Sequence, residues 1–84
     1  MKYLYYIELV NKDTNEYLLQ SKNFKQKAQA KKWLVQNIDY IDFYNIYVNI
    51  MQTTQDFVED SKICEIIGQN DFFYLAKRYE RKGE

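Results

Sequence analysis

The 84-residue sequence contains no histidine and no proline, and cysteine occurs once, at Cys64. Without histidine it lacks the commonest general base and the commonest metal ligand of proteins. A single cysteine cannot form an intramolecular disulfide, which is typical of proteins in a reducing cytosol. The two glycines, Gly68 and Gly83, each stand alone, so no phosphate-binding loop can be recognised. We therefore expect a protein that is not an enzyme and that uses no metal or cofactor.

Long hydrophobic runs are missing as well. No segment approaches the length of a membrane span, and the N-terminal stretch MKYLYYIELV alternates like a strand and lacks the features of a secretion signal. Neither sign of charge predominates, because 12 basic residues balance 12 acidic ones, which argues against a dedicated nucleic-acid binder. These features predict a cytoplasmic protein without membrane contact.

Aromatic residues, by contrast, are abundant. Nine tyrosines and five phenylalanines occur, and 46% of the residues are hydrophobic. Large rings supply much buried area per residue, which a small domain needs because its surface is large relative to its volume. We expect a single domain over residues 1–84, to which dimerisation would add stability.

The first half of the chain predicts a hairpin followed by a helix. Residues 2–10 are apolar on both alternating faces, as in a central strand, and residues 17–19 return after a polar turn at 11–16. Helical periodicity over 24–39 then predicts a helix, with Ser21 or Asn23 as its cap. Its buried face would comprise Ala30, Trp33, Leu34, Ile38 and Ile41.

The clearest alternation in the sequence is DFYNIYVNIMQ, residues 42–52, which predicts a third strand. One face is apolar and is predicted to be core: Tyr44, Ile46, Val48 and Ile50. The other face mixes rings and amides: Phe43, Asn45, Tyr47, Asn49 and Met51. The polar stretch at 53–56 is expected to end this strand.

The segment after this strand allows two interpretations. Asp56 and Glu59 have the spacing of a capping box that opens a helix, whereas the branched-chain run from Ser61 to Ile67 is typical of a strand. We favour the strand because the run is short and ends at Gly68. A last helix, capped by Asn70 or Asp71, would bury Phe72, Leu75, Ala76 and Tyr79. The predicted order is ββαββα, an α+β domain in which two helices pack on an antiparallel sheet.

Charge is unevenly distributed along the chain. Residues 21–32 contain five lysines and no acid, whereas residues 37–71 contain seven acids and one base, Lys62. Opposed charge patches of this kind help to orient a binding partner. The acids Asp56, Glu59 and Asp60 do not have the spacing of a calcium loop, so we expect them to cap and to form turns.

A face of rings and amides is typical of protein contact surfaces. We predict a protein-binding site at Asn45, Tyr47 and Asn49, which would be joined by nearby acids if the partner is basic: Asp39, Asp42, Asp56, Glu59 and Asp60. The same face could stack nucleic-acid bases, but its strand carries no basic residue. We expect Cys64 to be a small buried hydrophobic residue, because no histidine is present to activate it.

Two alternatives remain open. Lys22, Lys25 and Lys32 would fall on the side of the first helix away from Leu34, where they could contact the phosphates of RNA or DNA. In the other alternative, the tyrosine-rich faces of two copies meet in a structural homodimer.

Residues with AT-rich codons (Phe, Tyr, Met, Ile, Asn and Lys) account for 41 of the 84 positions, which indicates an AT-rich bacterial, phage or plasmid genome. In size and composition, though not in any motif, the chain resembles the small orphan proteins of phages and mobile elements, including anti-CRISPR and other anti-defence inhibitors. This resemblance implies a compact, non-enzymatic protein that blocks a host nucleic-acid-handling complex.

Overall fold

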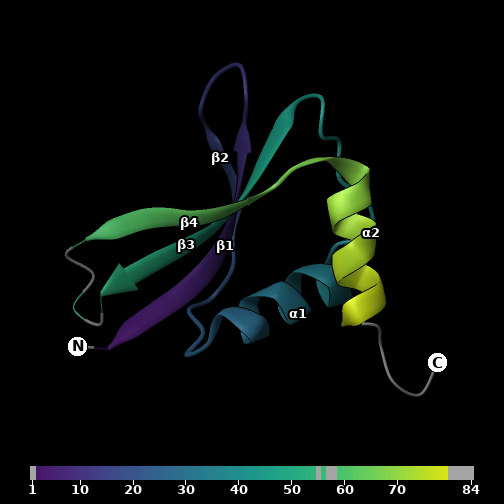
Figure 1. The fold of residues 1–84 in the computed structure, drawn as a ribbon. Coiled ribbons are helices and arrows are strands. Elements are labelled where there is room, and N and C mark those ends of the chain that lie inside the picture. Colours follow the sequence, from purple (N-terminus) through teal and green to yellow (C-terminus); the bar gives the residue numbers. More distant parts are fainter. Residues whose placement is uncertain (1, 55, 57–58, 80–84) are drawn as a thin grey trace.

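The structure is a computed structural model that describes residues 2–54, 56 and 59–79. It contains four strands and two helices in the order ββαββα, which confirms the predicted order (Figure 1). In chain order these are β1 (Tyr3–Asn11), β2 (Tyr17–Gln20), α1 (Lys27–Asn37), β3 (Ile46–Thr54), β4 (Asp60–Ile66) and α2 (Gly68–Arg78).

The four strands form one twisted antiparallel sheet in the order β2-β1-β3-β4. The predicted central position of the first strand is confirmed, because β1 lies between β2 and β3. The pairing of β1 with β3 runs without a register shift from Tyr3 opposite Thr54 to Asn11 opposite Ile46. Because successive residues of a strand point to opposite faces, this register decides which side chains meet the helices.

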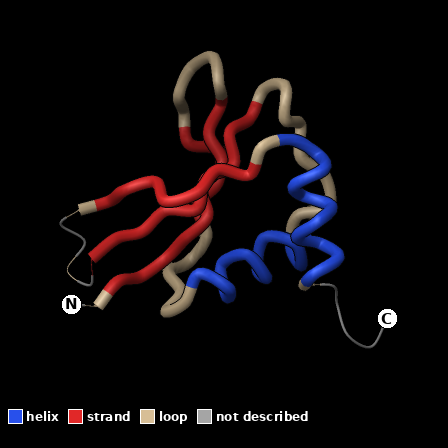
Figure 2. The backbone as a smooth tube through the Cα atoms, in the orientation of Figure 1, coloured by secondary structure: helices blue, strands red, loops and turns tan. Residues whose placement is uncertain are grey.

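Both helices lie on the same side of the sheet, so the fold has two layers (Figure 2). The core between the layers includes Ile7 from β1, Val48 and Ile50 from β3, and Ala30 and Leu34 from α1, all with no measurable exposure. Phe72 and Leu75 of α2 complete it, as their helical spacing predicted. This layer arrangement leaves the opposite face of the sheet without a helix among the described residues.

Helix α1 begins at Lys27 and ends at Asn37, inside the predicted range of 24–39. The predicted caps Ser21 and Asn23 are wrong, because the N-cap is Gln26. The side-chain oxygen of Gln29 accepts hydrogen bonds from the backbone N–H groups of Lys25 and Gln26, both at 3.2 Å. Ser21 instead contacts β1, where its Oγ accepts a hydrogen bond of 2.8 Å from the backbone N–H of Ile7.

The ambiguous segment is a strand, as favoured, because β4 pairs with β3 from Asp60 to Ile66. The alternative of a helix opened by Asp56 and Glu59 is therefore wrong. Helix α2 then begins at Gly68, whose φ of 78° is strained for any residue with a side chain. Its N-cap is Ile67, before the predicted Asn70 or Asp71, although the Asp71 carboxylate accepts a hydrogen bond from the Ile67 N–H at 3.1 Å.

The third strand starts four residues later than predicted. Asp42 and Asn45 close a turn in which the Asp42 carboxylate accepts hydrogen bonds from the Tyr44 backbone and the Asn45 side chain, at 3.1 and 2.7 Å. Aspartate stabilises turns in this way and interrupts the strand pattern. Tyr44, predicted as core, is consequently 93% exposed. Phe43, predicted for the other face, packs against the core, with its ring centroid 6.4 Å from that of Phe72.

Two further predictions about this part of the sheet are wrong. The stretch at 53–56 does not end the third strand at once, because Thr53 and Thr54 still pair with β1. Cys64 is exposed and not buried. It lies on β4, which is an edge strand of the sheet.

In the part of the chain that the structure describes, neither helix is long and apolar enough to cross a membrane. Both helices are 11 residues long.

Replacing Leu34 by alanine tests the core. Leu34 is fully buried between α1 and the sheet, so Leu34→Ala is expected to lower the free energy of unfolding by about 2–5 kcal/mol. Leu18, which is 51% exposed on β2, provides the matched control, and Leu18→Ala is expected to cost less than about 1 kcal/mol. Equilibrium urea unfolding measures both. Equal losses in the two variants would contradict this placement of the core.

Candidate protein-binding face

The candidate site is the face of the sheet that points away from α1 and α2, called here the helix-free face. The even-numbered residues of β1 and the odd-numbered residues of β3 lie on it, because their alternate neighbours form the core. Its central residues are Tyr6, Glu8, Val10, Tyr47, Asn49, Met51 and Thr53. On β4, Asp60, Lys62 and Glu65 pair with Thr53, Met51 and Asn49, which places them beside this face.

Glu8 and Asn49 occupy the middle of the helix-free face as direct partners in the β1–β3 register. They are only 6% and 8% exposed, although no helix of the described chain covers them. The Asn49 side-chain NH₂ donates a long hydrogen bond of 3.4 Å to a Glu8 carboxylate oxygen. The Asn49 oxygen Oδ1 is buried and has no hydrogen-bond partner among the described residues. A buried acceptor without a donor costs about 1–3 kcal/mol, so the Asn49 oxygen lowers the stability of the free protein.

A half-exposed ring borders the pair on β3. Tyr47 is 38% exposed, and the Lys12 ammonium lies 5.1 Å from the centroid of its ring. The same ammonium donates a hydrogen bond to the Phe43 carbonyl. Lys12 is therefore held in place and supports the ring by a cation–π contact.

On the other side of the pair, Lys62 and Glu65 of β4 form a salt bridge of 3.0 Å. Because Glu65 stands opposite Asn49 in the register, this ion pair lies next to the Glu8–Asn49 pair. The charge of Lys62 is thus matched by Glu65, and Glu8 remains the buried carboxylate at the centre of the face.

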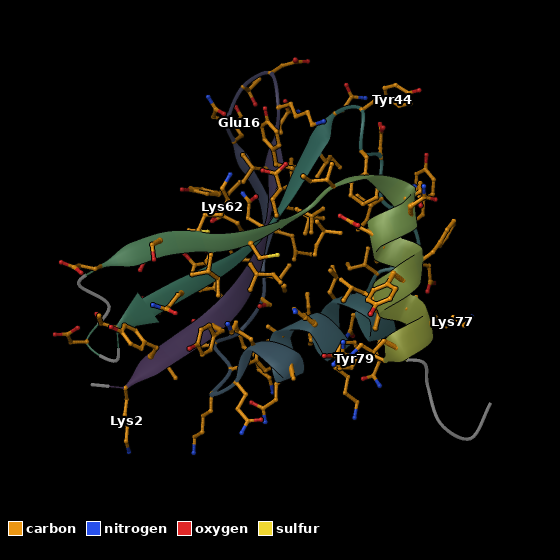
Figure 3. All side chains as sticks on the ribbon, viewed as in Figure 1. Lys2, Glu16, Tyr44, Lys62, Lys77 and Tyr79 are labelled. Carbon is orange, nitrogen blue, oxygen red and sulfur yellow. The ribbon has the colours of Figure 1, made fainter. Side chains whose placement is uncertain are left out.

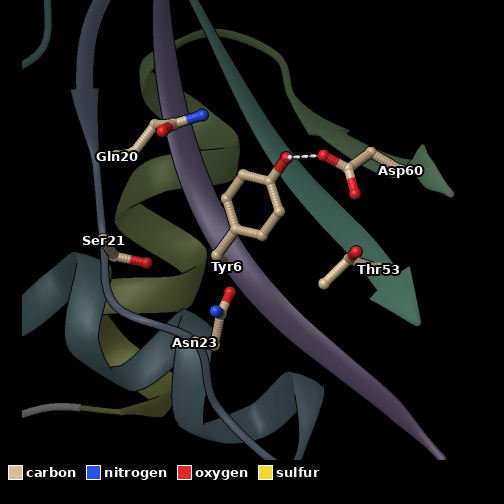
Figure 4. A pocket seen from close by; sticks show the side chains of 6 residues that line it. All are labelled: Tyr6, Gln20, Ser21, Asn23, Thr53 and Asp60. Carbon is tan, nitrogen blue, oxygen red and sulfur yellow. Dashed lines mark hydrogen bonds between the residues drawn. The ribbon is translucent and has the colours of Figure 1, made fainter. Parts of the chain in front are cut away.

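A polar hollow of about 210 Å³ lies near the end of β3 and the start of β4 (Figure 4). The Tyr6 hydroxyl donates a hydrogen bond of 3.1 Å to Asp60 across it. Burial, and then the hydrogen bond to the Asp60 carboxylate and its charge, raises the pKa of the Tyr6 phenol above its ordinary value of 10.0. The folded protein therefore keeps the proton of this phenol at alkaline pH values where an ordinary tyrosine loses it. The other lining residues are Gln20, Ser21, Asn23 and Thr53.

The structure brings together only part of the predicted site. Tyr47, Asn49 and Asp60 lie on or beside the helix-free face. The remaining predicted residues lie in the segments before and after β3: Asp39, Asp42 and Asn45 before it, and Asp56 and Glu59 after it. Opposite ends of a nine-residue strand are too far apart for these acids to form one patch.

The predicted lysines are also divided. Lys22 and Lys32 line a groove together with Phe24 and Trp33, whereas Lys25 is not among the residues that line it.

Sequence reasoning did not identify Tyr6 and Glu8 as site residues. Their signal was present, because Glu8 is the one charged side chain within a strand that is otherwise apolar on both faces. A charge at the centre of such a strand is rarely buried unless it is paired. Its partner Asn49 is known only from the register of β1 against β3, which connects residues 41 positions apart.

Within residues 2–54, 56 and 59–79, no three His, Cys, Asp or Glu side chains are grouped so that they could hold a metal ion. No family model matches this chain, and no similar protein was found among curated sequences or solved structures.

Replacing Tyr6 by phenylalanine tests the raised pKa. At about pH 8 the phenol is protonated in both states, and Tyr6→Phe is expected to cost about 1 kcal/mol for the lost hydrogen bond. Above pH 10 the unfolded wild-type chain loses this proton while the folded protein keeps it. Wild-type stability therefore falls relative to the variant, by about 1.4 kcal/mol between pH 8 and pH 11. Urea unfolding at the two pH values measures this change. An unchanged difference would show that the Tyr6 phenol titrates alike in both states.

Proposed function

We propose that this protein is a small, non-catalytic protein-binding module that docks through its helix-free face on a basic surface of its partner. The observation that carries the proposal is the Glu8–Asn49 pair at the centre of that face, in which the Asn49 oxygen is buried and has no hydrogen-bond partner among the described residues. A donor-rich group from a second protein would complete these hydrogen bonds, which would turn a cost in the free protein into a gain on binding.

The local charge favours a basic partner. The pair itself contains the Glu8 carboxylate, its neighbour Glu65 is matched by Lys62, and Asp60 adds a carboxylate at the end of the face. Lys12 is engaged at the edge of the face by the Phe43 carbonyl and the Tyr47 ring. An arginine guanidinium offers five donors in a planar fork and can satisfy a carboxylate and an amide oxygen together.

The surroundings of the pair also suit protein recognition. Tyr47 and Met51 belong to residue types that are enriched in interfaces. Both lie on β3, which is held by β1 on one side and β4 on the other. Side chains fixed on a central strand lose little conformational entropy on binding, so a small face of this kind can bind selectively.

Proteins that handle nucleic acids expose basic surfaces, which makes them suitable partners for an acidic centre. We extend the proposal accordingly to a cytoplasmic inhibitor, encoded by a phage or mobile element, that occupies such a surface in a host complex. The supports for this extension are the charge of the helix-free face and the small, tyrosine-rich composition of the chain.

A pull-down from a bacterial lysate with two matched double variants tests the binding face. Tyr47→Ala combined with Asn49→Ala removes a ring and an amide from the face, and is expected to reduce recovery of a stoichiometric partner at least about tenfold. Tyr44→Ala combined with Asn70→Ala removes the same groups from exposed positions elsewhere, and is expected to leave recovery unchanged. Circular dichroism is used to check that both variants fold.

Recovery of the same partner by both double variants, or of no partner by the wild type, would contradict the binding role. The inhibitor role is decided separately, by adding the wild-type protein to the purified partner bound to labelled nucleic acid. Release of the nucleic acid is expected. Its retention in a stable ternary complex would contradict inhibition by occupation while leaving the binding face intact.

A further inference from the structure

A second surface feature lies on the helix layer and is separate from the helix-free face. It is a groove of about 300 Å³ beside α1, called here the α1 groove, whose size is at the lower end of that of small-molecule sites. Its lining residues are Lys22, Phe24, Gln29, Lys32, Trp33 and Gln36.

Two aromatic rings form the apolar part of the α1 groove. The ring centroids of Phe24 and Trp33 are 6.4 Å apart, and both side chains are partly buried and pack against the core. Phe24 is fixed further by its backbone, which exchanges two hydrogen bonds with Tyr5 of β1, at 2.7 and 2.8 Å. The rings therefore offer a firm surface on which a flat group can stack.

Two cations accompany the rings. The Lys22 ammonium lies 5.5 Å from the centroid of the Phe24 ring, and Lys32 lines the groove from α1. None of the described residues that line the groove is acidic, and the sequence has no acid between residues 21 and 38. The local charge thus favours an anionic ligand, although the whole chain is neutral.

Rings beside lysines, with side-chain amides on the same lining, match the chemistry of a nucleotide. Bases stack on aromatic side chains irrespective of sequence, and phosphates are held by lysine. We propose that the α1 groove binds a nucleotide unit, with the base against Phe24 and Trp33 and the phosphate at Lys22 and Lys32. This site does not depend on the proposed function of the helix-free face.

The intrinsic fluorescence of the protein reports on this groove directly, because Trp33 is the only tryptophan in the chain. The emission is followed while adenosine monophosphate, or a single-stranded RNA of about ten nucleotides, is added. Saturable quenching is expected from at least one of them. Quenching by RNA alone identifies a nucleotide within a strand as the ligand, and quenching by the mononucleotide identifies a free nucleotide. Unchanged emission with both would overturn the proposal.

Salt dependence and two charge-matched variants test the role of the lysines. If Lys22 and Lys32 each bind one phosphate of the strand, RNA affinity should fall about sevenfold between 50 and 200 mM salt. Lys22→Ala combined with Lys32→Ala is expected to abolish most of this dependence and to weaken binding at low salt. Lys2 and Lys77 (labelled in Figure 3) are not among the residues that line the groove. Lys2→Ala combined with Lys77→Ala removes the same charge and is expected to bind as the wild type.

If both double variants lost RNA affinity equally, binding would depend only on the overall charge of the protein. That result would contradict a binding site in the groove. Quenching by inorganic triphosphate equal to that by the nucleotides would overturn stacking of the base. If RNA binds in the groove, the wild type and the Lys2→Ala, Lys77→Ala variant should have the same RNA affinity at 50 mM salt and again at 200 mM salt.

Discussion

The register of β1 against β3 is the constraint on which the rest of the structure depends. Both strands are nine residues long and pair over their whole length without a bulge. This register puts Ile7, Val48 and Ile50 under the helices and turns Glu8 and Asn49 to the opposite face. A slip by one residue would exchange the two sets and place a carboxylate and an amide in the apolar core. The apolar pattern of the two strands thus fixes the position of the polar pair as well.

The polar pair is unusual because it is buried without a covering layer of described residues. The pair lies on β1 and β3, which are flanked by β2 and β4 in the sheet. Native domains are stable by only about 5–15 kcal/mol, so an unsatisfied acceptor that costs about 1–3 kcal/mol is substantial. A sheet built for stability alone would place apolar residues at these two positions. Recognition of a second protein gives a physical reason for keeping them polar.

Much of the fold could be predicted because its signals are local. The apolar run of β1, the alternation in β3 and the branched run of β4 are each visible within one short segment. The helical spacing of Leu34 and Leu75 reflects burial of one helix face. The turn before β3 was not predicted, because the sequence still alternates there although the Asp42 side chain forms turn hydrogen bonds. The faces predicted for Phe43 and Tyr44 were wrong for this reason. The site was predicted less completely. Tyr47 and Asn49 follow from alternation, but Glu8 joins them only through long-range pairing, and most of the predicted acids lie outside the sheet face.

We propose that the Glu8–Asn49 pair is kept for binding and not for stability. The free energy of unfolding of the double variant Glu8→Met with Asn49→Leu, measured by urea denaturation, tests this claim most directly. Both replacements preserve the approximate volume and remove the buried acceptors, so the variant is expected to be as stable as the wild type or more stable by about 1–3 kcal/mol. A loss of more than about 2 kcal/mol would show that the polar pair is a structural requirement of the sheet and would contradict the account.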